Sequence, residues 1–448
     1  MNRSSQNSYY FIGVGGVGMS ALARLCKAKG HIVYGYDRTA TPLTYQLEQE
    51  GITVGYDASL DALTTPLMSK EIQVVYTAAI SSSHPQLAFY LKQGNRVVKR
   101  AQFLAEICGE EYVMAVAGTH GKTTTSSILA HILLKTQQSF TAILGGFLNE
   151  GQNNLIQKGN DIFVVEADEY DRSFLHLYPS IACITSMEAD HLDIYKTEEE
   201  FKEAFVQFSN QVKKELVVAY GVPLSGWTYG VDVNADYKAF NLCITPTGYS
   251  FDLKTPSGVF EKVRINLLGK HNVENALGAI AMADLAGLEL ESVLSALSSF
   301  KGVYRRMNVY EWEQAIVLDD YAHHPTEIRS VYQTLKSIYP NQKNCVVFQP
   351  HLFSRTRDFM EEFATVLGLF DEVILLDIYP AREEPIEGID SNTLLKKIKN
   401  KQKKIIQKQE IKTTLQHSDA GVFALLGAGD IGEEIQRLKT EFTQNETV

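Results

Sequence analysis

Residues 115–125 read AVAGTHGKTTT, and this stretch decides the central part of the fold. An apolar run, 112–117, leads into it, and a helical pattern over 126–134 follows it. A glycine-containing loop between a strand and a helix is typical of a phosphate site, because backbone N–H groups and a helix N-terminus then point at the anion. Gly118 lies two residues later than the first glycine of the standard Walker pattern, so the loop is a shorter variant. The stretch predicts a site for a nucleoside triphosphate.

The residues in and near this loop predict how the triphosphate and a metal ion are held. Lys122 is expected to contact the β- and γ-phosphates, and the Thr123 hydroxyl a magnesium ion. The apolar run 162–165 ends at Glu166, a position where strand-end acids hold magnesium beside such loops. Since like charges repel, the crowded carboxylates behind Glu166 are expected to share cations, although an acidic surface loop explains the same residues. These further carboxylates are Asp168, Glu169 and Asp171.

Two later segments add candidate contacts. His191 follows the apolar run 181–184 and is a candidate ligand for a second cation, with a purely structural histidine as the alternative. The segment 269–275, GKHNVEN, opens a helical pattern and places an imidazole and two amides near one turn. That set suits the edge of an adenine, or it caps the helix.

A second glycine loop opens the chain. Gly13-Val-Gly15-Gly-Val-Gly18 follows an apolar run and matches the dinucleotide fingerprint, and Asp37 ends the next strand where a ribose-binding acid is expected. Physically the motif requires only a tight turn that brings a diphosphate to backbone at a helix N-terminus. The residues alone therefore leave three interpretations open: a nicotinamide or flavin nucleotide, another diphosphate-linked nucleoside such as a UDP-sugar, or a structural turn.

Composition limits the class of protein. The chain has 448 residues, 45% of them hydrophobic and 21% charged, which is typical of a globular protein of about three domains. The net charge of −11 argues against nucleic acid as a partner, and we interpret the lysine run 396–408 as the exposed face of a helix. No apolar stretch approaches the roughly 18 residues that a membrane span needs. The five scattered cysteines fit reduced thiols in a cytoplasm, so we expect a cytoplasmic protein without a membrane partner.

The pattern of strands and helices predicts an α/β fold. Strands alternate with helices in the first and third segments, which indicates parallel sheets with ligands at the carboxyl ends of the strands. Residues 217–265 read as strands and turns without crossover helices. We place the domain boundaries at 1–109, 110–300 and 301–448.

Taken together, these motifs resemble the bacterial Mur ligases, and most closely their alanine-adding branch. The resemblance covers nearly the whole chain, in the expected order. Its motifs are residues 13–18, 118–125, 166–169, 187–191, 269–275, 302–306, 319–325, 349–357 and 427–431.

The resemblance implies an N-terminal Rossmann-like domain for UDP-N-acetylmuramate, a central P-loop ATPase-like domain with a mixed sheet for ATP, and a C-terminal Rossmann-like domain for L-alanine. The implied ATP contacts are Gly118, Thr119, His120, Gly121, Lys122, Thr123, Thr124, His271, Asn275 and Arg305. The implied contacts to the sugar nucleotide or amino acid are Gly13, Gly15, Gly16, Gly18, Asp37, Ser81, His84, Tyr321, His323 and Arg355. The implied magnesium ligands are Thr123, Glu166 and His191, and the implied catalytic residues are Lys122, Glu166, His191, His323 and Arg355.

The resemblance also implies a reaction, in which ATP converts the sugar-nucleotide carboxylate into an acyl phosphate that the amino group attacks. Two departures from the family pattern bear on this. Several members carry Arg where this chain has Leu352, so that contact is not carried over. Later-acting ligases use a carbamoylated lysine where this chain has Phe205-Val206, which favours the alanine-adding branch.

Three alternatives remain. They are a recycling ligase that joins the same sugar nucleotide to a preformed peptide, a nucleotide-dependent dehydrogenase, and a non-catalytic nucleotide-binding scaffold. We expect a monomer or weak homodimer.

Overall fold

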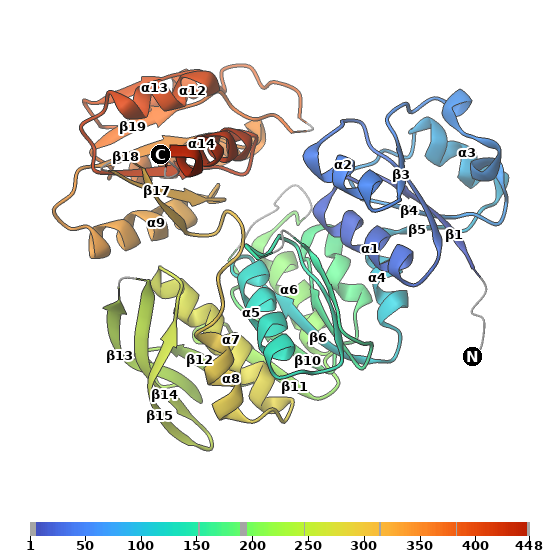
Figure 1. The fold of residues 1–448 in the computed structure, drawn as a ribbon, viewed down its shortest axis with the longest axis horizontal. Coiled ribbons are helices and arrows are strands. Elements are labelled where there is room, and N and C mark those ends of the chain that lie inside the picture. Colours follow the sequence, from blue (N-terminus) through green and yellow to red (C-terminus); the bar gives the residue numbers. More distant parts are fainter. Residues whose placement is uncertain are drawn as a thin grey trace. The chain divides into compact units, whose positions relative to one another are not determined.

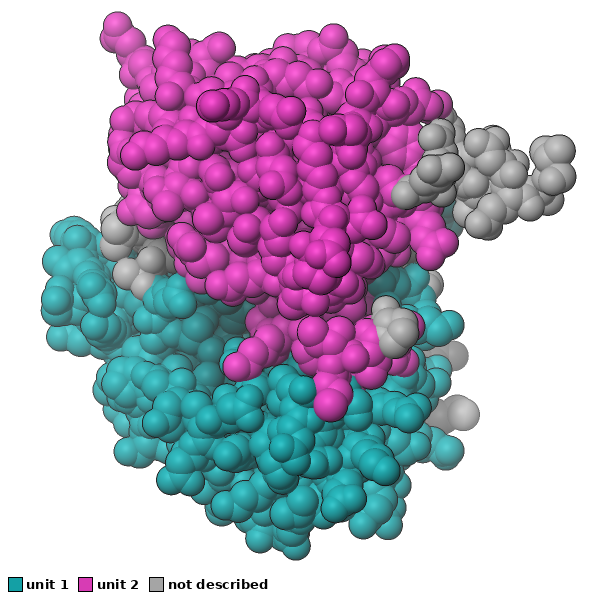
Figure 2. Space-filling view, turned by 90° about the vertical axis from the view of Figure 1, so that its left-hand side faces the viewer, with its two compact units in different colours: residues 1–242, 250–265, 273–301 teal, residues 243–249, 266–272, 302–448 magenta. Residues whose placement is uncertain are grey.

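The computed structural model describes residues 6–150, 153–188, 195–245, 247–312, 315–381 and 383–445. The chain divides into two compact units (Figure 2). The first unit comprises residues 1–242, 250–265 and 273–301, and the second comprises 243–249, 266–272 and 302–448. Within the described ranges, no helix is both long and apolar enough to cross a membrane.

The first sheet has five strands in the order β3-β2-β1-β4-β5, and the neighbouring strands pair in parallel (Figure 1). The strand order reverses between β1 and β4, which is where ligands bind in open parallel sheets. The loop after β1, residues 13–16, lies at that point and leads into α1. The strands are β1 Ser8–Ile12, β2 Ile32–Tyr36, β3 Thr53–Gly55, β4 Gln73–Tyr76 and β5 Val97–Lys99. The helices are α1 Val17–Ala28, α2 Pro42–Gln49, α3 Pro85–Gln93 and α4 Arg100–Cys108.

The central sheet has ten strands in the order β15-β14-β13-β12-β11-β10-β6-β9-β7-β8. It is mixed, because β7 and β8 pair antiparallel while β6 pairs in parallel with both β9 and β10. The strands are β6 Tyr112–Ala117, β7 Phe140–Ile143, β8 Leu155–Gln157, β9 Ile162–Glu166, β10 Ile181–Ile184, β11 Glu215–Ala219, β12 Trp227–Val231, β13 Tyr237–Thr245, β14 Gly248–Thr255 and β15 Gly258–Ile265. Its helices are α5 Lys122–Lys135, α6 Glu198–Ser209, α7 Lys270–Leu285 and α8 Leu290–Leu297.

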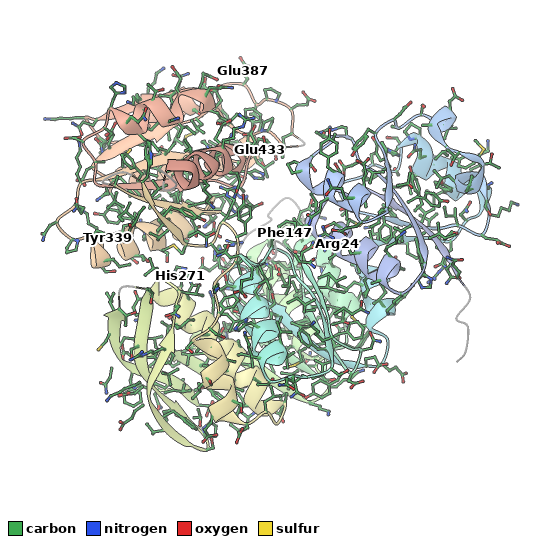
Figure 3. All side chains as sticks on the ribbon, viewed as in Figure 1. Arg24, Phe147, His271, Tyr339, Glu387 and Glu433 are labelled. Atoms are coloured by element: carbon green, nitrogen blue, oxygen red, sulfur yellow. The ribbon has the colours of Figure 1, made fainter. Side chains whose placement is uncertain are left out.

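Polar contacts join the helices of the first sheet to the central domain inside the first unit. The Arg24 guanidinium of α1 (labelled in Figure 3) donates to Asn154 Oδ1 at 2.6 Å and to Glu50 at 2.7 and 2.9 Å. The Asn154 amide in turn donates to Val17 O at 2.7 Å. Arg24 and Asn154 are both buried, so these hydrogen bonds fix α1, and with it the first glycine loop, against the central domain.

The third sheet has six strands in the order β16-β17-β21-β18-β19-β20, with β16 antiparallel to β17 and the other pairs parallel. Apolar clusters cover both of its faces. The strands are β16 Asn308–Trp312, β17 Ala315–Asp320, β18 Asn344–Phe348, β19 Glu372–Leu375, β20 Lys403–Ile405 and β21 Val422–Leu426. The helices are α9 Pro325–Ile338, α10 Phe353–Asp358, α11 Met360–Leu367, α12 Ser391–Lys397, α13 Ile411–Gln416 and α14 Ile431–Asn445.

The three sheets confirm the predicted α/β class, but the interpretation of the lysine run 396–408 was wrong. The run crosses the end of α12, a loop and the edge strand β20. Lys403 donates to the carbonyl oxygens of Leu395 and Ile398 at 2.9 and 2.6 Å. This lysine therefore supplies hydrogen-bond donors to carbonyl groups at the C-terminus of α12, where a positive charge is also favourable.

Candidate active site

The phosphate loop lies between β6 and α5, as predicted. Its glycines Gly118 and Gly121 leave no room for a side chain. Gly118 has φ +129°, and a Cβ there would lie 2.2 Å from Thr185 Oγ1. Gly121 has φ +85°, and a Cβ there would lie 2.4 Å from Asn275 Oδ1. Both positions exclude a side chain, because real Cβ atoms do not approach other atoms so closely. Thr124, inside α5, is buried.

The segment after β10 holds the loop backbone. The His120 N–H donates to Ser186 Oγ at 2.9 Å, and the Thr119 hydroxyl donates to Glu188 O at 2.7 Å. Thr185 Oγ1 donates to the carbonyl oxygens of Ala117, at 3.1 Å, and of His120. These bonds fix the loop before any ligand arrives, which favours pre-organised anion binding.

Lys122 forms a buried ion pair. Its ammonium donates to both carboxylate oxygens of Glu169, at 2.9 and 2.7 Å, and to Gly118 O at 2.6 Å. Glu169 is 1% exposed and its backbone carbonyl accepts a bond from the buried Tyr195 hydroxyl at 2.6 Å. Burial pulls the pKa of Lys122 down, but the charges of Glu169 and its acidic neighbours outweigh burial and raise this pKa. The ammonium therefore stays charged inside the loop.

Glu166 ends β9 beside the loop, as predicted. Thr123 Oγ1 donates to it at 3.0 Å, Ser126 Oγ at 3.2 Å and the Gly145 N–H at 2.6 Å. Burial raises the pKa of Glu166, and these hydrogen bonds and the Lys122 charge offset that effect only in part. A desolvated carboxylate beside a threonine hydroxyl is a pair of hard oxygen donors of the kind that magnesium prefers.

The other two carboxylates of the acidic loop, residues 166–172, are paired with cations from the first sheet. Arg100 donates to Asp168 at 3.0 Å, and Lys99 donates to Asp171 at 2.8 Å. Asp171 and Arg172 both have left-handed backbone, with φ of 54° and 53°. Two consecutive non-glycine residues in this region store strain, which is found most often at functional sites. The cations expected among the crowded acids thus include protein side chains.

His191, the predicted ligand for a second cation, lies outside the described residues. Within the described ranges, no three His, Cys, Asp or Glu side chains form a cluster that could hold a metal ion. The other two predicted magnesium ligands, Thr123 and Glu166, are bonded to each other at 3.0 Å.

The glycine loop after β1 forms the expected tight turn. Gly13 has φ +89° and its N–H donates to Tyr36 O at 2.7 Å, while the Gly16 N–H closes the turn on Gly13 O at 3.2 Å. Asp37 Oδ2 accepts the Gly15 N–H at 2.8 Å. One N–H group of the loop is thus already bonded to a carboxylate of the protein, that of Asp37. At Gly18, a Cβ would lie 2.6 Å from an Arg100 nitrogen.

His84 and Ser81 follow β4 at the same edge of this sheet. The His84 ring lies 4.9 Å from the Tyr36 ring, and burial lowers its pKa. Both ring nitrogens are shielded from solvent and lack a hydrogen-bond partner among the described residues. Such a group is expected to receive a partner from a ligand. Ser81 is exposed and bonds to Ser83 Oγ at 2.8 Å.

His271 and Asn275, the predicted adenine contacts, lie on the first turns of α7 (His271 is labelled in Figure 3). Asn275 is buried beside Gly121, and its Oδ1 accepts from Thr125 Oγ1 at 3.3 Å. The His271 Nδ1 bonds to Ser330 Oγ of α9 at 2.8 Å. Asn275 therefore lies beside the phosphate loop in the first unit, while His271 and Ser330 both belong to the second unit.

Arg305 is buried within the second unit. Its guanidinium donates to the buried Asp319 at 3.0 Å, to Gly427 O at 2.6 Å and to Gly429 O at 3.4 Å. These bonds join the start of β16 to the end of β21 and give Arg305 a structural role. Its predicted contact with ATP stays a prediction.

Tyr321 and His323 meet in the turn after β17. The Tyr321 ring is 5.4 Å from the His323 ring, and His323 Nδ1 bonds to Tyr321 O at 2.9 Å. Burial lowers the pKa of His323 to about 4, assisted by the charges of Arg355 and Arg306 and opposed by that of Glu327. Arg355 on α10 is thus close enough to act on His323. The turn presents a neutral imidazole among arginines.

Leu352 caps α10 in an unusual conformation. Its φ is +70° and its ψ 136°, and its N–H donates to Tyr379 O at 3.0 Å. This is the position where several Mur ligases carry Arg, so the strain falls at a site expected to bind substrate.

Sequence reasoning missed two roles. Arg100 was not singled out, and Glu169 was counted as an acid without its pairing to Lys122. Arg100 and its partner Asp168 are 68 residues apart in the sequence, and Lys122 and Glu169 are 47 residues apart, so no local sequence pattern predicts either contact. Only the crowding of carboxylates hinted that cations would come from elsewhere.

Three family models match the chain. The model "Mur ligase family, catalytic domain" matches residues 8–112, "Mur ligase middle domain" matches 116–283, and "Mur ligase, glutamate ligase domain" matches 305–430. Together they span all three sheets.

Curated relatives and solved structures agree with these models. The chain is 49% identical to the UDP-N-acetylmuramate–L-alanine ligase of Christiangramia forsetii, over 96% of each chain. It is 48% identical to that of Flavobacterium psychrophilum, over 99% of this chain and 100% of the relative. The crystal structure of the Thermotoga maritima UDP-N-acetylmuramate-alanine ligase matches with a TM-score of 0.84 and 28% identity, over 98% and 99% of the chains. A murein peptide ligase from Psychrobacter arcticus matches with a TM-score of 0.72 and 25% identity, over 97% and 98%. The chain belongs to the Mur ligase family.

Proposed function

We propose that this chain is a UDP-N-acetylmuramate–L-alanine ligase, which uses ATP to form the amide bond in peptidoglycan precursor synthesis and releases ADP and phosphate. The observation that carries the proposal is its identity of 48–49% with enzymes of that name, over nearly their full lengths. The site supplies the matching chemistry, with a phosphate loop and a strand-end carboxylate bonded to its threonine.

The proposed reaction solves a chemical problem, because a carboxylate has no good leaving group for attack by an amine. Transfer of the γ-phosphoryl group to the carboxylate gives an acyl phosphate, and the amine then displaces phosphate. Both substrates are anions, so positive charge and oriented N–H groups must offset their repulsion. Lys122 and the N-terminus of α5 supply these in the first unit.

We propose one role for each segment. Residues 1–109 bind UDP-N-acetylmuramate, supported by the turn at Gly13 and the shielded His84 nitrogens. Residues 110–300 bind ATP through the phosphate loop. Residues 301–448 bind L-alanine near Tyr321 and His323, supported by the surrounding arginines.

Thr123 and Glu166 fit a magnesium ion, which when bound neutralises phosphate charge. Glu166→Gln replaces a charged oxygen ligand by a weaker neutral one, so we expect manganese binding, measured by electron paramagnetic resonance in the presence of ADP, to weaken at least tenfold. The matched control is Glu150→Gln, which removes a surface ion pair with Lys301 at 2.9 Å and should bind manganese normally. Equal manganese affinity in wild type and Glu166→Gln would contradict the assignment of Glu166 as a ligand.

The test of the function is phosphate release from ATP with defined substrates. We expect release with UDP-N-acetylmuramate plus L-alanine, and little with a tripeptide in place of L-alanine. Preference for the tripeptide would identify a recycling ligase instead. Binding of NAD or NADP in a calorimetric titration, without phosphate release, would identify a dehydrogenase.

We further propose that the enzyme works in the cytoplasm as a monomer or weak homodimer. The location is supported by the five free cysteines, four of them buried. Sedimentation velocity over a range of concentrations tests the oligomeric state.

A further inference from the structure

Asn154 is a buried asparagine between helix α1, which follows the first glycine loop, and the strands beside the carboxylate of Glu166. It is 0% exposed. Its Oδ1 accepts from Arg24 Nη1 at 2.6 Å, and its Nδ2 donates to Val17 O at 2.7 Å and to Ser20 Oγ at 3.0 Å. Because both amide hydrogens and the amide oxygen are bonded, the side chain is held in one orientation. Asn154 is therefore fixed to the first turn of α1.

This first turn is continuous with the glycine loop. Gly16 is the N-cap residue of α1, and its carbonyl accepts the Ser20 N–H at 2.8 Å. The Gly16 N–H in turn donates to Gly13 O at 3.2 Å, and Ser20 Oγ donates to Val17 O at 2.8 Å. A ligand that orders the glycine loop therefore also orders the two acceptors of the Asn154 amide.

The backbone of Asn154 continues the connection toward the magnesium site. Asn154 O accepts the Leu144 N–H at 2.9 Å, directly after the pairing of β7 with β8. The next residue, Gly145, donates its N–H to Glu166 Oε1 at 2.6 Å. A Cβ on Gly145 would lie 2.4 Å from Glu166 Oε2, so the Gly145 backbone packs directly on this carboxylate. Glu166 accepts from Thr123 at 3.0 Å, and the connection thus reaches the phosphate loop.

We propose that Asn154 couples the two nucleotide sites, as a positioning residue through which order in the first glycine loop reaches Glu166. The proposal rests on the proposed function for the identity of the ligands, and it adds a residue placed outside both glycine loops. The expected coupling is positive, because groups that the first ligand has already ordered lose no further entropy when the second ligand binds. It is also reciprocal, so each ligand raises the affinity for the other by the same factor.

The test measures this coupling by calorimetric titration of the full chain. ADP with magnesium is titrated without UDP-N-acetylmuramate and again at its saturating concentration, and the ratio of the two ADP dissociation constants is the coupling factor. We expect a factor of at least about five in wild type, the lower end of the usual range. In Asn154→Ala we expect a factor near one, because the side-chain bonds to α1 are lost.

Three further variants separate coupling from stability, since a loss of stability by itself affects both titrations alike. Asn154→Asp keeps an acceptor for Arg24 but has no amide donor for α1, so its factor should also fall toward one. Ser20→Ala removes one of the two acceptors on α1 and should give an intermediate factor, even if the Asn154 variants do not fold. The matched control is Asn153→Ala, whose exposed side chain accepts the local Leu155 N–H at 3.0 Å, and which should keep the wild-type factor.

The outcomes distinguish this inference from the proposed function. A factor of one in wild type, or an unchanged factor in Asn154→Asp and Ser20→Ala, would overturn the inference and leave the function intact. An equal fall of the factor in Asn153→Ala would also overturn it, because a general disturbance of this segment would then explain the effect. Failure of wild type to bind UDP-N-acetylmuramate would overturn the proposed function itself.

Discussion

Lys122 donates to three acceptors in the phosphate loop, namely both oxygens of Glu169 and the carbonyl of Gly118. An ammonium has three donors, so a phosphate must replace or share one of these partners. The pair also explains how the loop tolerates a buried cation before nucleotide arrives. Glu169 therefore bears on stability as well as on chemistry.

We expect Lys122→Ala to lose activity by orders of magnitude and to lower the free energy of unfolding by about 3 kcal/mol, since breaking a buried ion pair leaves an uncompensated charge. The double variant Lys122→Ala/Glu169→Gln should recover most of that stability and none of the activity. Urea unfolding and phosphate release measure the two effects. Ligase activity in the double variant would refute the assigned role of Lys122.

Gly118→Ala tests the shape of the same loop. A Cβ there would meet Thr185 Oγ1 at 2.2 Å and the Ser186 nitrogen at 2.8 Å, so the loop must shift. We expect ADP affinity to fall at least tenfold, measured by calorimetry. The control is Gly30→Ala, at a position that also has a positive φ, +84°, but with nothing within 4 Å of its Cβ. Normal ADP binding by Gly118→Ala would show that the loop does not cradle the phosphates.

The elements that could be predicted from the sequence are those marked by a local sequence motif. The strand-to-helix turns at β1–α1 and β6–α5 follow from glycines at fixed spacing, and Glu166 follows from an apolar run that ends in an acid. Pairings between distant segments could not be predicted. Strands β11, β12 and β13 pair in parallel without intervening helices, and no sequence periodicity predicts that arrangement. The lysine run was assigned to one helix because charge alone does not mark where a helix ends.

The turn between β17 and α9 predicts a particular pH response. Burial holds the pKa of His323 at about 4, below the 6.5 of an ordinary histidine, so its ring stays neutral at neutral pH. The unfolded chain takes up this proton more readily, so His323 lowers the free energy of unfolding as the pH falls from 6.5 to 4. NMR of the histidine rings should show that the His323 resonance, identified by its loss in His323→Gln, has no transition near pH 6.5. A His323 transition near pH 6.5 would contradict the burial argument.

For the whole molecule, three sheets and their order along the chain follow from alternating strands and helices, and the family models match each of them. The candidate site was predictable where a motif is contiguous, as in the two glycine loops. It was not predictable where the fold joins distant residues, as for Arg100 with Asp168, because each residue alone is an ordinary surface charge. The boundaries at 109 and 300 remain predictions, since no change in composition marks them.

The complete reaction makes a prediction that depends on all three segments together. If the carboxylate is activated by the γ-phosphoryl group, one of its oxygens must leave with inorganic phosphate when the amine attacks. UDP-N-acetylmuramate labelled with heavy oxygen in its carboxylate should therefore pass one labelled atom to phosphate for each amide formed, as measured by mass spectrometry. Activation by adenylation would instead place the label in AMP and release pyrophosphate. The position of these residues favours the first route, because Lys122 and Thr123 begin α5 directly after the glycine turn, where loops of this kind bind the end of a triphosphate chain. Label in AMP would refute both the acyl phosphate and the proposed ligase mechanism.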